Sequence, residues 1–229
     1  MSEELAMNEL LHPLLALRWS PTMFDESYEA RTAEVESLLE AARWAPSAGN
    51  SQPWAFITAR RGDAVHTRLL RHLTASSARW APTASVLVVN LCHRYVEDTD
   101  WDFSEFSLYD LGQAVAHMTI QAQSLGLFAR QFRAFDQAGI AAEFDVPEHW
   151  QVTSMSAFGR LPKAVGTQTP MTTDAGQSRQ RRSMSEVSWL TSVHSSRRSF
   201  HQPPAVGRTQ PIVSGASADT LVSRRPRSR

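Results

Sequence analysis

The sequence predicts an α+β domain in which helices flank a mixed sheet, and three patterns lead to this fold class. Helical and strand-like segments are interspersed between residues 32 and 159, without the regular strand–helix–strand units of a parallel sheet. Residues 84–92 (ASVLVVNLC) form a continuous, mainly apolar run rich in β-branched residues, which is typical of a strand buried on both faces. Residues 106–125 carry an apolar seam at helical spacing, which serves either the core or a partner helix. The seam consists of Leu108, Leu111, Val115, Met118, Ala122 and Leu125.

The elements in the first half of the chain follow from local patterns. Residues 32–43 have apolar residues at helical spacing, and Pro46 marks the end of that helix. Residues 54–59 (WAFITA) have the composition of a strand. Asp63 is suited to be the N-cap of a helix that continues through Leu73.

The second half contains a loop, two strands and a short helix besides the long helix. Residues 93–105 are acidic and aromatic, so we expect a loop that covers part of the molecule. Gly126 is placed to cap the long helix, and a short strand follows at 127–133. Asp136 opens a short helix, and residues 152–159 form a last core strand.

The composition divides the chain into a folded domain and a tail. We expect residues 1–189 to form one domain, which includes an extended linker rich in Pro, Thr and Gly at 160–178. Residues 190–229 show no sustained apolar period, so we expect a disordered tail. The net charge of zero hides an asymmetry, because residues 188–229 contain seven Arg and one Asp. Such a tail attracts phosphates, but it has no folded motif, so nucleic-acid binding is disfavoured.

Several classes of protein are disfavoured by what the sequence lacks. No apolar run approaches the roughly 20 residues of a membrane helix, and the acidic N-terminus does not resemble a signal peptide, so we expect no membrane association. The single cysteine, Cys92, suits a reducing cytoplasm and a buried structural role. HExxH, CxxC, GxSxG, P-loop and GxGxxG motifs are absent, so metal-dependent enzymes, serine hydrolases and dinucleotide-binding folds have little support.

A loop of small polar residues at 46–54 (PSAGNSQPW) separates a helix from a strand. Small residues let a flat ligand approach the backbone, and Ser47, Asn50 and Gln52 offer hydrogen-bond donors and acceptors. A planar heterocycle with carbonyl groups and ring nitrogens suits this mixture. The plainer alternative is a helix stop followed by a surface loop, with Trp54 packed in the core.

Six segments, of which this loop is one, carry a family resemblance. The stretch APSAGNSQPWAFI resembles the flavin-contacting segment of the nitroreductase family, the FMN-dependent NAD(P)H oxidoreductases. The match covers about residues 10–189, and its other segments resemble the family in the same order. They are ALRWSPTMFD (16–25), YDLGQAVAHMTIQAQSLGL (109–127), ARQFRAFD (129–136), FGRLPKA (158–164) and RQRRSMSEV (179–187). The resemblance implies a mixed, mainly antiparallel sheet in an intertwined homodimer, whose two FMN sites are each built from both subunits.

The resemblance also implies which residues contact the cofactor. Arg18 is expected chiefly at the FMN phosphate, because a guanidinium matches a phosphate bidentately. The other contacts expected at that end are Trp19, Ser20, Arg179 and Arg181. The contacts expected at the flavin ring are Thr22, Gln131, Phe132 and Arg133 from one subunit, and Pro46, Ser47, Ala48 and Asn50 from the second. Gln52 either joins these contacts or holds the loop.

Two positions depart from the family's pattern. Thr22 stands where the family usually has Lys or Arg beside the flavin pyrimidine. A cation there would stabilise the charge that N1 gains on reduction. Arg133 stands where the family often has a small residue, and it either supplies the missing positive charge or crowds the ring and impairs FMN binding.

The function implied by the resemblance is flavin-dependent reduction of a small molecule. NADH or NADPH would pass a hydride to flavin N5, and a nitroaromatic, a quinone or a similar electrophile would then be reduced. No catalytic side chain and no metal is required. Aromatic residues would wall the acceptor pocket or else belong to the core: Trp101, Phe103, Phe106 and Tyr109. The alternative is a non-catalytic protein that binds FMN for storage or sensing.

Overall fold

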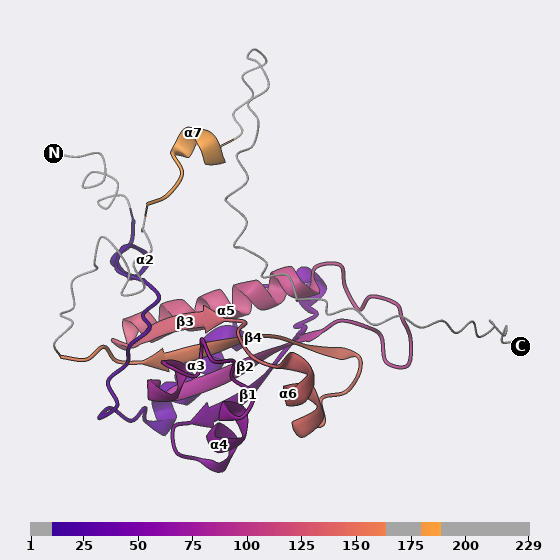
Figure 1. Ribbon diagram of the computed structural model, residues 1–229. Helices are drawn as coiled ribbons and strands as arrows, with labels where there is room; N and C mark the ends of the chain where they lie inside the picture. Colours follow the sequence, from indigo (N-terminus) through magenta and orange to yellow (C-terminus); the bar gives the residue numbers. More distant parts are fainter. Residues whose placement is uncertain (1–10, 164–179, 189–229) are drawn as a thin grey trace, which may run out of the picture. The chain divides into compact units, whose positions relative to one another are not determined.

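The computed structural model describes residues 11–163 and 180–188 of the chain (Figure 1). Its centre is an antiparallel four-stranded sheet with the strand order β1-β2-β4-β3. The strands are β1 (Trp54–Arg60), β2 (Val86–His93), β3 (Phe128–Phe132) and β4 (Trp150–Gly159). Within the described residues, β1 and β3 are therefore the two edges of the sheet.

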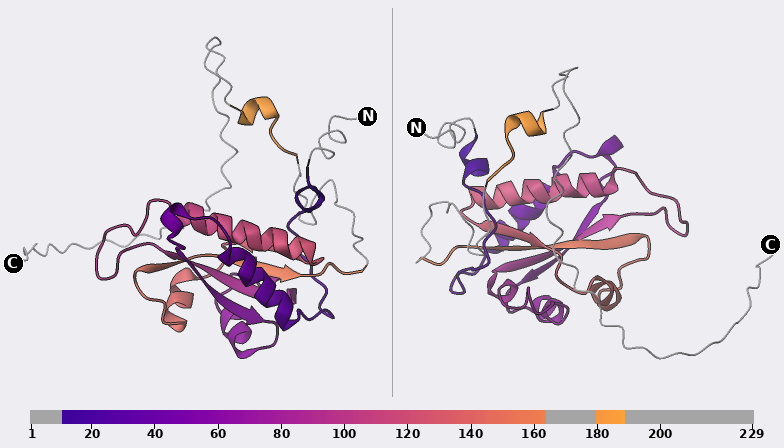
Figure 2. Two further views of the ribbon diagram at one scale, coloured as in Figure 1. Left: turned by 180° about the vertical axis from the view of Figure 1, so that it is seen from behind. Right: turned by 45° about the horizontal axis from the view of Figure 1, so that its top comes forward.

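Helices cover both faces of this sheet, with α5 on one side and α4 and α6 on the other (Figures 1 and 2). The longer helices are α3 (Thr32–Arg43), α4 (Ala64–Leu70), α5 (Ser107–Ser124) and α6 (Gln137–Glu143). The short turns are α2 (Pro13–Ala16), η1 (Ala48–Asn50), η2 (Ala81–Thr83) and α7 (Met184–Val187). Helix α7 belongs to a second compact unit of the chain, which begins at Arg182.

The central strand β2 is buried on both faces, as its apolar sequence predicts. Val86 and Val88 point into the apolar cluster formed with α3 and α5. Leu87 and Val89 point into the opposite cluster, formed with α4 and α6. Full burial of an aliphatic side chain stabilises the fold by roughly 1.5–3 kcal/mol, so β2 contributes to the packing of both helical layers on the sheet.

The predicted α+β fold class is confirmed, and every strand pairing among the described residues is antiparallel. The helix predicted at 32–43 coincides with α3, and the strand predicted at 54–59 coincides with β1 apart from one residue. α4 ends at Leu70, three residues earlier than predicted. The cause is a long-range contact, because Leu73 pairs with Phe135 in an isolated antiparallel bridge and leaves the helix.

The predicted caps are confirmed. The Asp63 side chain accepts a 2.6 Å hydrogen bond from the backbone of His66 at the start of α4. The Asp136 side chain accepts a 3.0 Å bond from the backbone of Gly139 at the start of α6. Gly126 follows α5 with a φ of 70°, a left-handed conformation that favours glycine.

The loop at 93–105 is tied to the sheet at its start and exposed at its tip. The ring of His93 lies between the rings of Phe103 and Trp150, with centroid distances of 3.8 and 4.8 Å. Trp101 near the tip is 77% exposed. The start of the loop therefore packs on the sheet, whereas Trp101 near its tip does not.

The remaining expectations concern Cys92, the linker and the tail. The Cys92 thiol is buried as predicted, and burial raises its pKa to about 11, which keeps it protonated at neutral pH. Most of the linker predicted at 160–178, and all of the tail at 190–229, lie outside the described residues. No described helix is both long enough and apolar enough to cross a membrane.

Glu34 is a buried carboxylate in the first turn of α3. It is 3% exposed and accepts hydrogen bonds from the Tyr28 hydroxyl at 2.6 Å and from the Arg31 backbone at 2.8 Å. Burial alone would raise the pKa of Glu34, but the bonds from Arg31 and Tyr28 outweigh burial and bring the pKa to about 2. Because this pKa is depressed, the ionised group stabilises the fold above pH 4.5, and this stabilisation is lost as pH falls toward 2.

We expect Glu34→Gln to lower the free energy of unfolding at pH 7 by roughly 2–3 kcal/mol, because the amide cannot accept the same charged hydrogen bonds. The variant should also lose less stability than the parent protein between pH 4.5 and 2. Urea titrations of both proteins across that range measure the difference. An identical pH dependence in the two proteins would contradict this role of Glu34.

Candidate functional site

The element Arg18–Ser20 lies against the edge strand β3. Nη1 of Arg130 donates a 2.8 Å hydrogen bond to the Ser20 carbonyl, although the two residues are 110 positions apart. Nη1 of Arg18 donates to Ser20 Oγ at 3.4 Å. The Trp19 side chain is 3% exposed and meets Phe128 edge to face, with centroids 6.0 Å apart. The indole thus anchors the element in the core, which leaves the Trp19 backbone as the part available to a ligand.

Positive charge gathers at this element. Burial lowers the pKa of Arg18, and the positive charge of Arg181 lowers it further. The charge of Arg181 thus acts on Arg18, although 163 positions separate the two residues in the sequence. The family resemblance implies that this pair binds the FMN phosphate. Arg179, the third arginine expected here, lies outside the described residues.

Three residues on β3 or just after it were expected to contact the flavin ring, and their side chains have different surroundings. Gln131 is exposed, and its side chain donates to the hydroxyl of Thr119 on α5 at 3.3 Å. Phe132 is half-buried. Nη2 of Arg133 donates to Gln137 Oε1 at 2.9 Å, which directs this guanidinium toward α6. Thr22 is half-buried in the segment that follows Ser20.

Sequence reasoning missed two residues at this edge, Arg130 and Trp80. The guanidinium carbon of Arg130 lies 5.1 Å from the centre of the Trp80 ring. The same ring meets Phe132 edge to face at 4.9 Å. The available signal was a charged residue within a short core strand, but no local pattern connects position 130 with position 80.

The loop at 46–52 adopts an unusual backbone conformation. Gly49, Asn50 and Gln52 all have left-handed φ values, of 58°, 56° and 49°. For a residue other than glycine this conformation costs roughly 1–2 kcal/mol, and such strain concentrates at functional sites. A Cβ added at Gly49 would meet nothing within 4 Å, so the space beside the loop's backbone is open at this point.

Three side chains hold this strained loop in place. Ser47 Oγ accepts a 3.0 Å hydrogen bond from the Gln52 backbone, and the Gln52 side chain donates to the Asn50 carbonyl at 3.3 Å. Gln52 therefore holds the loop, which was one of its two expected roles. Asp110 on α5 is 2% exposed, and its Oδ2 accepts a 3.0 Å bond from the Ala48 backbone. The loop is thus fixed to α5 as well as to itself, and Pro46 is exposed at its start.

The two groups of predicted contacts occupy opposite edges of the sheet. The loop at 46–52 leads into β1, whereas the Arg18–Ser20 element is bonded to β3. Strands β2 and β4 lie between those edges. At about 4.8 Å per strand, the edges are separated by roughly 14 Å. One chain therefore brings together the members of each group but keeps the groups apart.

Buried polar atoms without partners mark both groups. Among the described residues, seven buried side-chain nitrogen or oxygen atoms lack a hydrogen-bond partner. Three of them belong to these groups or their anchors: Trp19 Nε1, Arg130 Nε and Ser51 Oγ. Unsatisfied buried polar atoms are rare in proteins, and they are often explained by a bound polar group or a functional role. The cations and the open loop backbone therefore fit a polar, anionic ligand with a flat ring.

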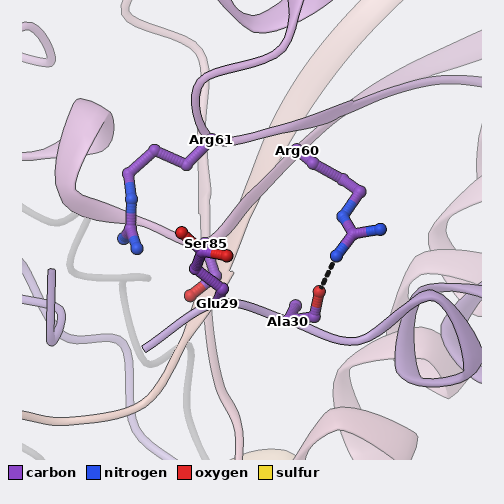
Figure 3. A pocket seen from close by; sticks show the side chains of 5 residues that line it. All are labelled: Glu29, Ala30, Arg60, Arg61 and Ser85. Carbon is purple, nitrogen blue, oxygen red and sulfur yellow. Dashed lines mark hydrogen bonds between the residues drawn. The ribbon is translucent and has the colours of Figure 1, made fainter. Parts of the chain in front are cut away.

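The smaller of two hollows elsewhere is structural. It measures about 30 Å³ and is lined by Glu29, Ala30, Arg60, Arg61 and Ser85 (Figure 3). Its arginines are occupied, because Arg60 donates to the Ala30 carbonyl and Arg61 donates to the Tyr28 carbonyl at 2.7 Å. A space of this size holds about one water molecule, so we assign it no ligand.

The larger hollow is an open groove of about 550 Å³ between the loop after β2, helix α6 and the start of β4. It is lined by Tyr95, Leu108 and Trp150, and also by Gln137, the partner of Arg133. Ligand sites are typically 300–1,000 Å³, so this groove has the size for a small molecule.

The aromatic residues expected around an acceptor are divided between core and surface. Phe103 stacks on His93. The others are exposed: Trp101 by 77%, Tyr109 by 68% and Phe106 by 48%. Within the described residues, no cluster of His, Cys, Asp or Glu has the arrangement of a metal site.

Comparison with known proteins supports the family resemblance. Residues 15–84 match the model of the nitroreductase family. A Streptomyces coelicolor protein named for NADH dehydrogenase or NAD(P)H nitroreductase activity is 29% identical over 160 residues, which are 57% of this chain and 78% of that protein. An oxygen-insensitive NADPH nitroreductase of Helicobacter pylori is 41% identical over 56 residues, which are 24% of this chain and 27% of that enzyme.

Solved structures share the fold. A crystal structure described as an oxidoreductase containing FMN superimposes with a TM-score of 0.69 at 26% identity, and the match covers 79% of this chain and 91% of that one. A Desulfovibrio desulfuricans protein described as a nitroreductase in complex with FMN superimposes with a TM-score of 0.62 at 21% identity, covering 79% and 97%. The second likeness concerns the fold alone.

We expect Asp110→Ala to loosen the loop at 46–52, because the Ala48 N–H would lose its buried acceptor. The free energy of unfolding should fall by roughly 1–3 kcal/mol. The Ala48 amide should also exchange with deuterium faster than in the parent protein. Asp102→Ala, which removes a 57%-exposed carboxylate, is the matched control and should change neither quantity measurably. Unchanged exchange at Ala48 in the Asp110 variant would show that the loop is held by other contacts.

Proposed function

We propose that this chain, which resembles the nitroreductase family, is an oxidoreductase that uses FMN to pass a hydride from NADH or NADPH, via flavin N5, to a small electrophile. A nitroaromatic or a quinone is the acceptor class we propose. When bound, FMN supplies the redox chemistry, and the protein binds, orients and tunes it. The single buried cysteine is in keeping with a reducing cytoplasm as the proposed location.

One observation carries the proposal, namely the 2.8 Å hydrogen bond between Arg130 and the Ser20 carbonyl. It joins the Arg18–Ser20 element, which lies in the stretch that matches the family, to the strand that carries Gln131 and Phe132. This bond supports our proposal that the phosphate and the ring bind side by side. We assign Arg18 and Arg181 to the phosphate, because the charge of Arg181 acts on Arg18 and guanidinium groups bind phosphate strongly.

We further propose that two copies of the chain share each site. The loop at 46–52 lies at the β1 edge, away from the β3 edge, so it would have to reach the flavin of a partner subunit. The strained, well-anchored backbone of this loop supports such a role, since a preorganised surface binds a flat ring without a further ordering cost. Exposed aromatic residues at the start of α5, Phe106 and Tyr109, are proposed for the acceptor side.

Replacing Arg18 tests the phosphate assignment. We expect Arg18→Ala to raise the Kd for FMN by about ten- to a hundredfold, because a charge-assisted hydrogen bond contributes roughly 1.5–3 kcal/mol. Arg71→Ala is the matched control, since it removes a 67%-exposed arginine that lies 3.8 Å from Glu143. Fluorescence titration with FMN measures both affinities. Equal affinity in the Arg18 variant and the parent protein would refute the assignment.

Turnover separates an enzyme from a binding protein. We expect the FMN-loaded protein to oxidise NADH or NADPH in the presence of a quinone or a nitrofuran, and the rate should rise with FMN occupancy. Tight FMN binding without such turnover would favour the alternative of a storage or sensing protein. If the purified protein neither contains FMN nor takes it up, both functions are excluded.

A further inference from the structure

Arg130 occupies an unusual position for a charged residue. It is half-buried in the edge strand β3, and its guanidinium is held on one side by the Ser20 carbonyl at 2.8 Å and on another by the Trp80 ring at 5.1 Å. Its Nε is buried and has no hydrogen-bond partner among the described residues. The side chain is therefore fixed in place but incompletely satisfied.

The charge of Arg130 is also not neutralised by the described part of the chain. Each ion pair among the described residues involves another cation: Arg31, Arg43, Arg68, Arg71, His72 or Arg94. A partly desolvated cation without a carboxylate is unfavourable on its own. It becomes favourable when negative charge is brought beside it. The position thus points to a ligand that carries negative charge, at least in one of its states.

The surroundings of Arg130 place that charge between the two parts of the proposed cofactor site. Ser20, its hydrogen-bond partner, precedes Thr22 by two residues. Phe132 follows Arg130 by two residues on β3, so both side chains leave the same face of the strand, and both contact Trp80. Arg133 cannot take the same place while its guanidinium is bonded to Gln137.

We propose that Arg130 supplies the positive charge that Thr22 lacks, so that it positions the Arg18–Thr22 segment and stabilises the negative charge that the flavin ring gains on reduction. The inference rests on the proposed function, because it assumes that FMN binds at this edge. It differs from one of the two expectations from sequence for Arg133, in which that residue supplied the missing charge. Arg133 instead acts on α6 through Gln137.

The midpoint potential of the bound flavin tests the proposal. Arg130→Gln is expected to make the potential more negative and to raise the Kd for FMN roughly tenfold, because both the charge and the bond to Ser20 are weakened. Arg130→Lys, which keeps the charge, should restore most of the potential but less of the affinity. Arg71→Gln, at a 67%-exposed arginine outside the proposed site, is the matched control and should leave the potential unchanged. Arg133→Gln tests the alternative in which Arg133 supplies the charge.

The possible outcomes distinguish a failure of the inference about Arg130 from a failure of the proposed function. If the parent protein holds FMN and Arg130→Gln has the same potential as the parent, the inference about Arg130 is wrong while the proposed function stands. A shift in the Arg133 variant in place of the Arg130 variant would return the role to Arg133. Failure of the parent protein to bind FMN would overturn both. Thermal unfolding of the FMN-free variants shows whether any loss of affinity arises from misfolding. If Arg130→Gln does not fold, the midpoint potential of Arg130→Lys still tests the role of the charge.

Discussion

The strand order β1-β2-β4-β3 is the constraint on which the rest of the structure depends. It sends the small-residue loop and the arginine-bearing element to opposite edges of one sheet. Each edge is well built by itself, since Asp110 holds the loop and Arg130 holds the arginine element. In the proposed function, the β3 edge binds the phosphate and one side of the flavin ring, and the loop at the β1 edge of a second chain covers the other side of the ring.

Both edges contain features that are unfavourable until something binds. At the loop these features are left-handed residues other than glycine, Asn50 and Gln52. At the opposite edge the feature is the half-buried guanidinium of Arg130, whose Nε has no hydrogen-bond partner among the described residues. Such features persist where the surrounding structure fixes them, and the buried central strand β2 supplies that rigidity. A polar ligand with a phosphate and a ring would offset these unfavourable terms.

Patterns that are local in sequence allowed much of the fold to be predicted. The apolar spacing of α3, the apolar run of β2 and the capping residues Asp63 and Asp136 can each be recognised from neighbouring residues alone. The end of α4 could not be predicted, because it depends on Leu73 meeting a strand-like segment more than 60 residues away.

The candidate site, too, could be predicted only in part from the sequence. The loop at 46–52 and the Arg18–Ser20 element were proposed as cofactor contacts because they resemble segments of the family, and these contacts stay predictions. The role of Arg130 was missed, and the direction of Arg133 was not foreseen, since both depend on tertiary partners: Ser20 and Trp80 for one, Gln137 for the other. Residue type indicates that an arginine is available, whereas tertiary contacts determine which arginine can lie beside the proposed cofactor.

Mixing two defective chains tests the shared site most directly. Arg18→Ala disables the element at the β3 edge, and Asp110→Ala disables the loop at the β1 edge. If each site takes one edge from each subunit, co-expressed variants form mixed dimers in which one site is intact, and about a quarter of all sites should regain tight FMN binding. If both edges of a site come from one chain, no intact site can form. The mixture would then bind only as much FMN as the average of the two variants measured separately. That result would contradict a site shared between subunits.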